Sequence, residues 1–126
     1  MKKRSYLRDE NGASSAEFAM VIIPFVVAIF GIINVSLMMY ANHTLQYAVE
    51  AAARYYSVTC TSSCASNTTV QNYASSHYSG PSISPVFTAA TNASGCSHTV
   101  TGQGTFPLNF IIGSRNVSLA ATACFP

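Results

Sequence analysis

The sequence predicts an α+β protein: a long N-terminal helix that crosses a membrane and continues as a stalk, then a small disulfide-braced, β-rich head with one short helix. Three observations predict this class. Residues 18–41 carry no charge. An apolar stripe at helical spacing then continues toward residue 57. The remaining chain is rich in Ser and Thr, contains all four cysteines, and alternates short strand-like segments with Gly- and Pro-containing turns.

The composition indicates a membrane-associated or assembly-bound protein. Charged residues make up 8% of the chain, against roughly 25% in an average soluble domain, and mean hydropathy is +0.28. Nine of the ten formal charges lie at or before Arg54, and Arg115 is the only later one. A soluble enzyme with so few charges would disperse poorly. The net charge of +2, without a basic stripe, argues against a nucleic-acid partner.

The uncharged run from Phe18 to Ala41 is long enough to span a membrane. As a helix it measures about 36 Å, against about 30 Å for a bilayer core. Four basic residues precede the run and only Arg54 follows closely, so the positive-inside rule places the N-terminus in the cytoplasm. A cleaved signal peptide would have an apolar region of only about 7–15 residues. An uncleaved signal anchor stays open as an alternative.

The helix is expected to continue beyond the membrane as a stalk, covering residues 13–57 and about 68 Å in all. Its apolar face recurs at helical spacing in Leu45, Val49, Ala52 and Tyr56. Glu50 and Arg54 form an i, i+4 pair expected to support the exposed face. Pro24, inside the apolar run, predicts a bend.

The head is expected to comprise residues 58–126. A short helix is predicted from Asn67, as its cap, to Tyr78, and Gly80-Pro81 ends it. Its inward-facing residues are expected to be Val70, Tyr73, Ala74 and Tyr78. Short strands are predicted at 86–90, 99–105 and 117–124. Gly102-Gln103-Gly104 is interpreted as a turn signal and not as a phosphate-binding loop.

All four cysteines follow the apolar run, which fits an oxidising compartment such as a bacterial periplasm. Three connectivities are possible. If strands 99–105 and 117–124 pair antiparallel, residues whose numbers sum to about 220 face each other. This favours a Cys96–Cys124 disulfide, and hence Cys60–Cys64. A metal site using Cys60, Cys64 and His77 or His98 is the rival, but it lacks a firm ligand spacing.

Catalytic chemistry is not expected in the head. No Asp or Glu follows Glu50, so a carboxylate pair or an Asp-oriented triad cannot be built there. His77 and His98 are single imidazoles among hydroxyl side chains. We therefore expect no enzyme activity, no catalytic residue, no metal and no cofactor.

The junction between the charged leader and the apolar run contains a single acidic residue, Glu17. A carboxylate at the start of an otherwise apolar membrane helix is costly and requires a partner. A simpler interpretation is a helix start, in which Ser14 or Ser15 caps the helix and Glu17 complements its N-terminal dipole. The two interpretations are compatible.

The same junction resembles a known class of proteins. A short basic leader ending in Gly12, with Glu17 five residues later and the aromatic Phe18 after it, resembles type IV-class prepilins. The stretch from Gly12 to Pro24, together with residues 45–56, resembles more narrowly the TadE-like minor pilins, or pseudopilins, of tight adherence (Tad) pili. The resemblance covers about residues 9–57, and more weakly 98–126.

This resemblance implies a function in assembling or initiating a Tad-type pilus and in surface adhesion. It implies that residues 1–12 are a cytoplasmic leader, which a prepilin peptidase removes after Gly12 to leave Ala13 first. Glu17 would then meet the free amine of Ala13 on a neighbouring subunit, and Phe18 and Pro24 would belong to the helix-assembly surface.

The implied partners are the prepilin peptidase, other pilin subunits, an inner-membrane assembly platform and the lipid bilayer. The implied location is the bacterial inner membrane with a periplasmic head, and the cell surface after assembly. An uncleaved, signal-anchored periplasmic scaffold of a secretion or pilus assembly machine is the alternative.

Overall fold

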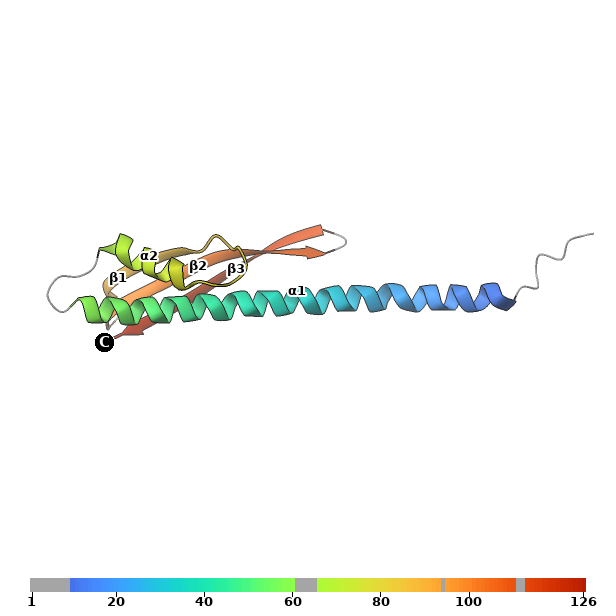
Figure 1. Ribbon diagram of the computed structural model, residues 1–126, viewed down its shortest axis with the longest axis horizontal. Coiled ribbons are helices and arrows are strands. Elements are labelled where there is room, and N and C mark those ends of the chain that lie inside the picture. Colours follow the sequence, from blue (N-terminus) through green and yellow to red (C-terminus); the bar gives the residue numbers. More distant parts are fainter. Residues whose placement is uncertain (1–9, 61–65, 94, 111–112) are drawn as a thin grey trace, which may run out of the picture.

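The computed structural model describes residues 10–60, 66–93, 95–110 and 113–126, and it confirms the predicted fold class. Two helices are followed by three strands: α1 (Glu10–Thr59), α2 (Asn67–His77), β1 (Val86–Ala93), β2 (Cys96–Phe110) and β3 (Gly113–Phe125). Figure 1 shows α1 as a single long rod, with α2 and the sheet gathered along its C-terminal half. At 50 residues, α1 is about 75 Å long and slightly exceeds the predicted range 13–57 at both ends.

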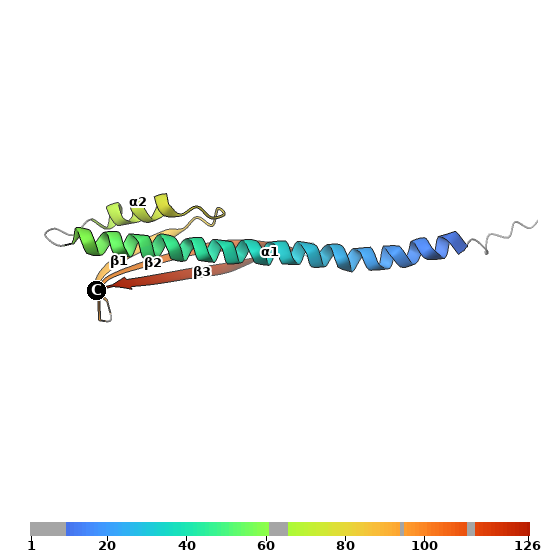
Figure 2. The same cartoon turned by 60° about the horizontal axis from the view of Figure 1, so that its bottom comes forward.

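The core forms where α1 meets the sheet. The three strands pair antiparallel in the order β1-β2-β3. α1 packs on β2 and β3, and α2 packs on α1 and β1. In Figure 2, α2 and β3 lie on opposite sides of α1. The predicted stripe of α1 is buried as expected, since Leu45, Val49, Ala52 and Tyr56 are all 3% exposed or less. Alternate strand residues complete the core, notably Phe87, Val100, Phe106, Leu119 and Ala121.

The strands are longer than predicted, and Gly102 and Gly104 are not in a turn. Both lie inside β2, where Gly102 pairs with Phe87 of β1 and Ala121 of β3. A Cβ atom on Gly102 would lie 2.7 Å from Val49 Cγ2 and 3.1 Å from Leu45 Cδ1. The missing side chain therefore lets α1 approach the sheet closely.

The short helix begins one residue earlier than expected. Ser66, and not Asn67, is the N-cap, and its hydroxyl accepts a hydrogen bond from the Thr69 N–H. Val70 and Ala74 are fully buried, as predicted, while Tyr73 and Tyr78 are partly buried against the core.

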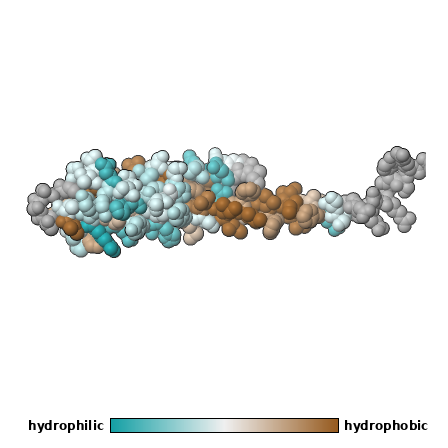
Figure 3. Space-filling view, in the orientation of Figure 1, coloured by the Kyte–Doolittle hydropathy of each residue, from teal (hydrophilic) through white to brown (hydrophobic). Residues whose placement is uncertain are grey.

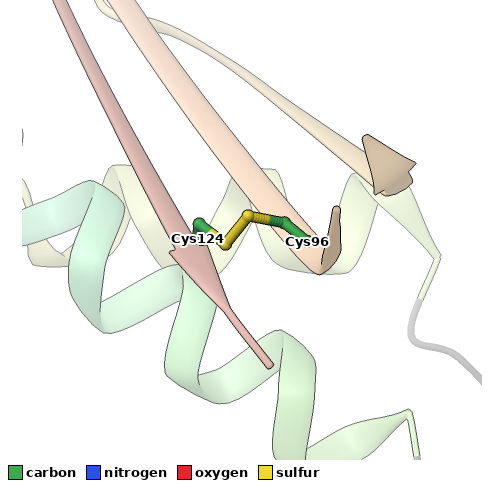
Figure 4. Close-up of a disulfide and its surroundings, with 2 residues drawn as sticks. All are labelled: Cys96 and Cys124. Carbon is green, nitrogen blue, oxygen red and sulfur yellow. A yellow bond between two sulfur atoms is a disulfide. The ribbon is translucent and has the colours of Figure 1, made fainter. Parts of the chain in front are cut away.

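A disulfide between Cys96 and Cys124 closes one end of the sheet, with the two Cα atoms 5.8 Å apart (Figure 4). The pairing is as predicted, but the register used to predict it was wrong by three positions. Cys124 pairs with Thr99, and the last β2–β3 pair toward this end joins His98 to Phe125. Cys96 lies just beyond that pair, within reach of Cys124. Cys60 is also disulfide-bonded, and Cys64, its predicted partner, lies outside the described residues.

Candidate helix-assembly surface

The N-terminal half of α1 carries an apolar surface that the head does not cover. Only this helix, among the residues described, is long and apolar enough to cross a membrane. Its most apolar stretch of 18 residues contains no buried residue. Phe18 is 68% exposed and Met20 is 79% exposed. Figure 3 shows this part as a continuous hydrophobic column that projects from a more polar head.

The exposed side chains surround the helix and do not form a single stripe. Every residue from 14 to 30 is exposed, so successive positions face all directions around the axis. A helix that is apolar on all sides is found inside a protein core or within a membrane. This half of α1 therefore has the length and composition of a membrane-spanning segment, and the described part of the head leaves it uncovered.

Glu17 lies at the leader end of this surface. Its side chain is exposed, and the described part of the chain offers it no hydrogen bond or ion pair. Gly12 and Ala13 lie in the first turn of α1, which begins at Glu10. The first N–H groups of a helix have no intrahelical acceptor. Opening this turn around the Gly12–Ala13 bond therefore costs less than opening the middle of the helix.

Pro24 lies within α1 without ending it. Figure 2 shows a gentle bend in the N-terminal third of the helix, the third that contains Pro24. A proline inside a helix has no N–H to donate, so the carbonyl of Met20 loses its usual donor. A neighbouring helix in the membrane can supply another.

The predicted Glu50–Arg54 pair is not formed. Both side chains are exposed on α1, and the structure shows no ion pair between them within its described ranges. The Arg54 guanidinium instead lies over the Phe125 ring, 5.5 Å from its centroid. The end of β3 therefore attracts Arg54 through a cation–π contact, which the helical spacing alone could not predict.

The two histidines of the head lie apart, each in an aromatic contact. His77 stacks on Tyr73, which in turn stacks on Tyr55 with ring centroids 4.3 Å apart. His98 meets the Tyr56 ring edge-on at 5.0 Å, and its Nδ1 has no hydrogen-bond partner. Within the described ranges, no three His, Cys, Asp or Glu side chains come together as a metal site. Tyr73 and His77 are one turn apart on α2, which was the only sequence signal for this stack.

A comparison with known protein families finds a match to α1. The family model described as "TadE-like protein" matches residues 12–54, from the predicted processing junction to the head-packed part of α1. The match covers 43 of the 126 residues, so α1 is the part of the chain that is similar to TadE-like proteins. The TadE-like family is a pilin-type structural family and not an enzyme family, and the match supports a pilin-like protein associated with Tad pili. No curated protein and no solved structure matches the chain.

Proposed function

We propose that this chain is a TadE-like minor pilin, or pseudopilin, that takes part in assembling or initiating a Tad-type pilus and in surface adhesion. A prepilin peptidase removes residues 1–12, and the mature subunit begins at Ala13. The observation that carries the proposal is the exposed apolar half of α1, with the Glu17 carboxylate at its leader end, which has no hydrogen bond or ion pair among the described residues.

The proposed mechanism is packing, without catalysis. α1 holds the subunit in the inner membrane with its N-terminus in the cytoplasm, and its apolar surface then packs against other pilin helices as the subunit leaves the bilayer. Glu17 and the amine of a neighbour's Ala13 are each penalised in lipid, and pairing them favours one axial register between helices. The assembly platform would supply the first partners.

The outer face of the sheet supports the adhesive part of the proposal. Thr88, Thr101 and Thr122 form a row across the three strands, linked by weak hydrogen bonds of 3.5 Å. A shallow hollow beside this row is lined by uncharged residues, among them Ser84, Gln103, Thr105 and Ser118. An uncharged, hydroxyl-rich surface can be buried against a neighbour, or against a ligand, without leaving an unpaired charge.

The first experiment measures the intact mass and N-terminal sequence of the protein from native membranes and from sheared surface fibres. A chain that begins at Ala13 supports processing, and its presence in the fibre fraction supports subunit status. A chain that still carries Lys2 and Lys3 overturns the proposal in favour of the signal-anchored scaffold.

The second experiment replaces Glu17. We expect Glu17→Ala to abolish incorporation into fibres, because the carboxylate that sets the helix register is lost, while membrane levels stay unchanged. Glu50→Ala is the matched control, since Glu50 is exposed on the head-packed half of α1 and should leave assembly intact. Normal fibre incorporation of the Glu17→Ala protein would contradict the pairing mechanism.

A further inference from the structure

The hollow on the outer face of the sheet lies where β1 leaves β2 unpaired. β1 begins at Val86, opposite Gln103, so β2 has no β1 partner beyond Gln103. The segment 82–84 runs along this part of β2 instead, and the Thr105 N–H donates to Ile83 O at 3.2 Å. The hollow has a volume of about 740 Å³, which lies within the roughly 300–1,000 Å³ of typical small-molecule sites.

Alternate residues of β2 and β3 supply the side chains of this hollow. Val100, Phe106 and Leu119 are buried on the face of the sheet that packs on α1. Because successive side chains of a strand point to opposite faces, the residues between them face away from α1. Those that line the hollow are Gln103, Thr105 and Pro107 from β2, and Asn116, Ser118 and Ala120 from β3. None of the residues that line it is charged.

Two amide side chains lie at opposite ends of the hollow. Gln103 pairs with Ala120, and Asn116 pairs with Pro107. Gln103 and Pro107 are four residues apart, which is about 13 Å along a strand. Both amide side chains are exposed, and neither makes a hydrogen bond or ion pair with the described part of the chain. Each amide therefore offers a carbonyl acceptor and two N–H donors to a ligand.

The surface between the two amides is uncharged and partly apolar. Thr105 and Ser118 pair with each other across β2 and β3, and both carry hydroxyl groups. Val86 and Pro107 add apolar surface. A charged ligand would lose water here without gaining a counter-charge. A wholly apolar ligand would cover the amides and leave their hydrogen bonds unmade. A neutral sugar chain has hydroxyl groups along its length and C–H groups on its ring faces, so it matches both kinds of surface.

The backbone beside the hollow is held in an uncommon conformation. Ser84 has a φ of 47°, in the left-handed region that residues other than glycine seldom adopt. Such residues persist only where the surrounding structure fixes them, and they cluster at binding sites. Ile83 fixes this segment, because its side chain is buried over Gly104, where a Cβ atom would lie 2.5 Å from Ile83 Cδ1. One side of the hollow is therefore in place before a ligand binds.

We propose that this hollow binds a neutral oligosaccharide, with Gln103 and Asn116 hydrogen-bonded to its two ends. The ligand is an oligosaccharide and not a single sugar, because the Thr105–Ser118 pair separates the two amides. The inference rests on the adhesive part of the proposed function, and it names the class of ligand that this surface would take.

The test measures the binding of short sugar chains to the full-length protein in micelles of a detergent without a sugar headgroup. The neutral probes are the trimers of glucose, mannose and N-acetylglucosamine, and the charged probes are the trimers of galacturonic acid and glucosamine. Saturation-transfer NMR detects binding, and titration calorimetry gives the affinity. We expect at least one neutral trimer to bind, and the charged trimers to bind at least about tenfold more weakly, because the hollow offers them no counter-charge.

Variants of the two amides locate the site. Gln103→Ala and Asn116→Ala should each weaken binding of the neutral trimer by about tenfold, since the sugar hydroxyls that they contact would lose their partners. Asn72→Ala is the matched control, because Asn72 is an exposed amide on α2 outside the hollow, and it should leave binding unchanged. Retention of the Cys96–Cys124 disulfide, checked by non-reducing mass mapping, confirms that each head is folded. Thr105→Ala reports on the same hollow if an amide variant fails to fold.

The outcomes separate the sugar site from the proposed function. Failure of every neutral trimer to bind, or equal binding by the amide variants and the Asn72→Ala control, overturns the sugar site. Charged trimers that bind as tightly as neutral ones overturn it as well. If the amide variants lose incorporation into fibres while no trimer binds, a neighbouring subunit and not a sugar covers the hollow. Processing at Ala13 and the effect of Glu17→Ala are measured separately, so either proposal can fail while the other stands.

Discussion

At the scale of single residues, Gly102 shows how one missing side chain positions an element. The sequence pattern around Gly102 predicts a turn, because the backbone freedom of glycine makes it common in turns. In the structure Gly102 has ordinary strand pairing on both sides, and its role is to leave room for Leu45 and Val49 of α1. A close approach of this kind depends on a helix more than fifty residues away in sequence, so local pattern could not predict it.

Gly102→Ala should lower the free energy of unfolding by about 1–3 kcal/mol, because the added methyl group overpacks the contact with Val49. Denaturant unfolding in micelles measures the effect. Gly31→Ala is the control, since a Cβ there has no neighbour within 4 Å and should leave stability unchanged or slightly higher. Equal effects at the two positions would show that the close approach does not matter.

Tyr78 gives a prediction about alkaline stability. Burial raises the pKa of its hydroxyl above the ordinary value of 10.0, nearby Tyr40 adds to the rise, and a hydrogen bond with Thr44 opposes it. The folded chain therefore keeps this proton at a pH where the unfolded chain loses it. The free energy of unfolding therefore keeps its full value below about pH 10, and it falls as the pH rises from there through the folded-state pKa of Tyr78.

Unfolding midpoints measured between about pH 9 and 11 test this linkage. Tyr78→Phe should flatten the alkaline decline, although it also removes the 2.6 Å hydrogen bond to Pro81 O and so lowers stability at every pH. Tyr47→Phe is the control, because Tyr47 is 63% exposed. An unchanged slope in Tyr78→Phe would contradict the assignment.

At the scale of elements, the Cys96–Cys124 disulfide closes a segment of 28 residues that contains most of β2 and β3. Replacing both cysteines with Ser should cost about 3–4 kcal/mol of unfolding free energy, since the unfolded chain regains the entropy of an open loop. Thermal unfolding of the head measures the loss. The paired Cys60→Ser and Cys64→Ser protein should lose less, because the predicted loop is shorter. A larger loss in that protein would refute this ranking.

The helices were more predictable than the sheet. α1 follows from the uncharged run and the Leu45–Tyr56 stripe, both of which are local and periodic. The predicted strands were too short, because β2 and β3 continue to pair with each other past Pro107, as far as Phe110 and Gly113. The register of β2 and β3 depends on that long-range pairing. The predicted sum of paired residue numbers was therefore wrong by three, although the predicted disulfide was correct. Glu17, Gly12 and Ala13 were identified from sequence alone, and their roles stay predictions.

At the scale of the whole molecule, the charges before Phe18 predict one orientation in the membrane. Alkaline phosphatase fused through a flexible linker after Pro126 should be active, since it would fold outside the cytoplasm. Replacing Lys2, Lys3 and Arg4 with Asn should reduce that activity by weakening the positive-inside bias. An active N-terminal fusion together with an inactive C-terminal fusion would contradict this topology and indicate the opposite orientation.

Because α1 is one continuous helix, sliding it along a neighbouring helix is coupled to rotation about its own axis. The same helix is exposed at Glu17 and buried at Leu45, without a linker between the two. Moving such a helix by one residue along a neighbour, in equivalent contacts, requires about 1.5 Å of travel and about 100° of turn, as for a screw. Under the proposed pairing, Glu17 sets the register of α1 against its neighbour. That register therefore also sets the direction, around the fibre axis, in which the row of Thr88, Thr101 and Thr122 faces.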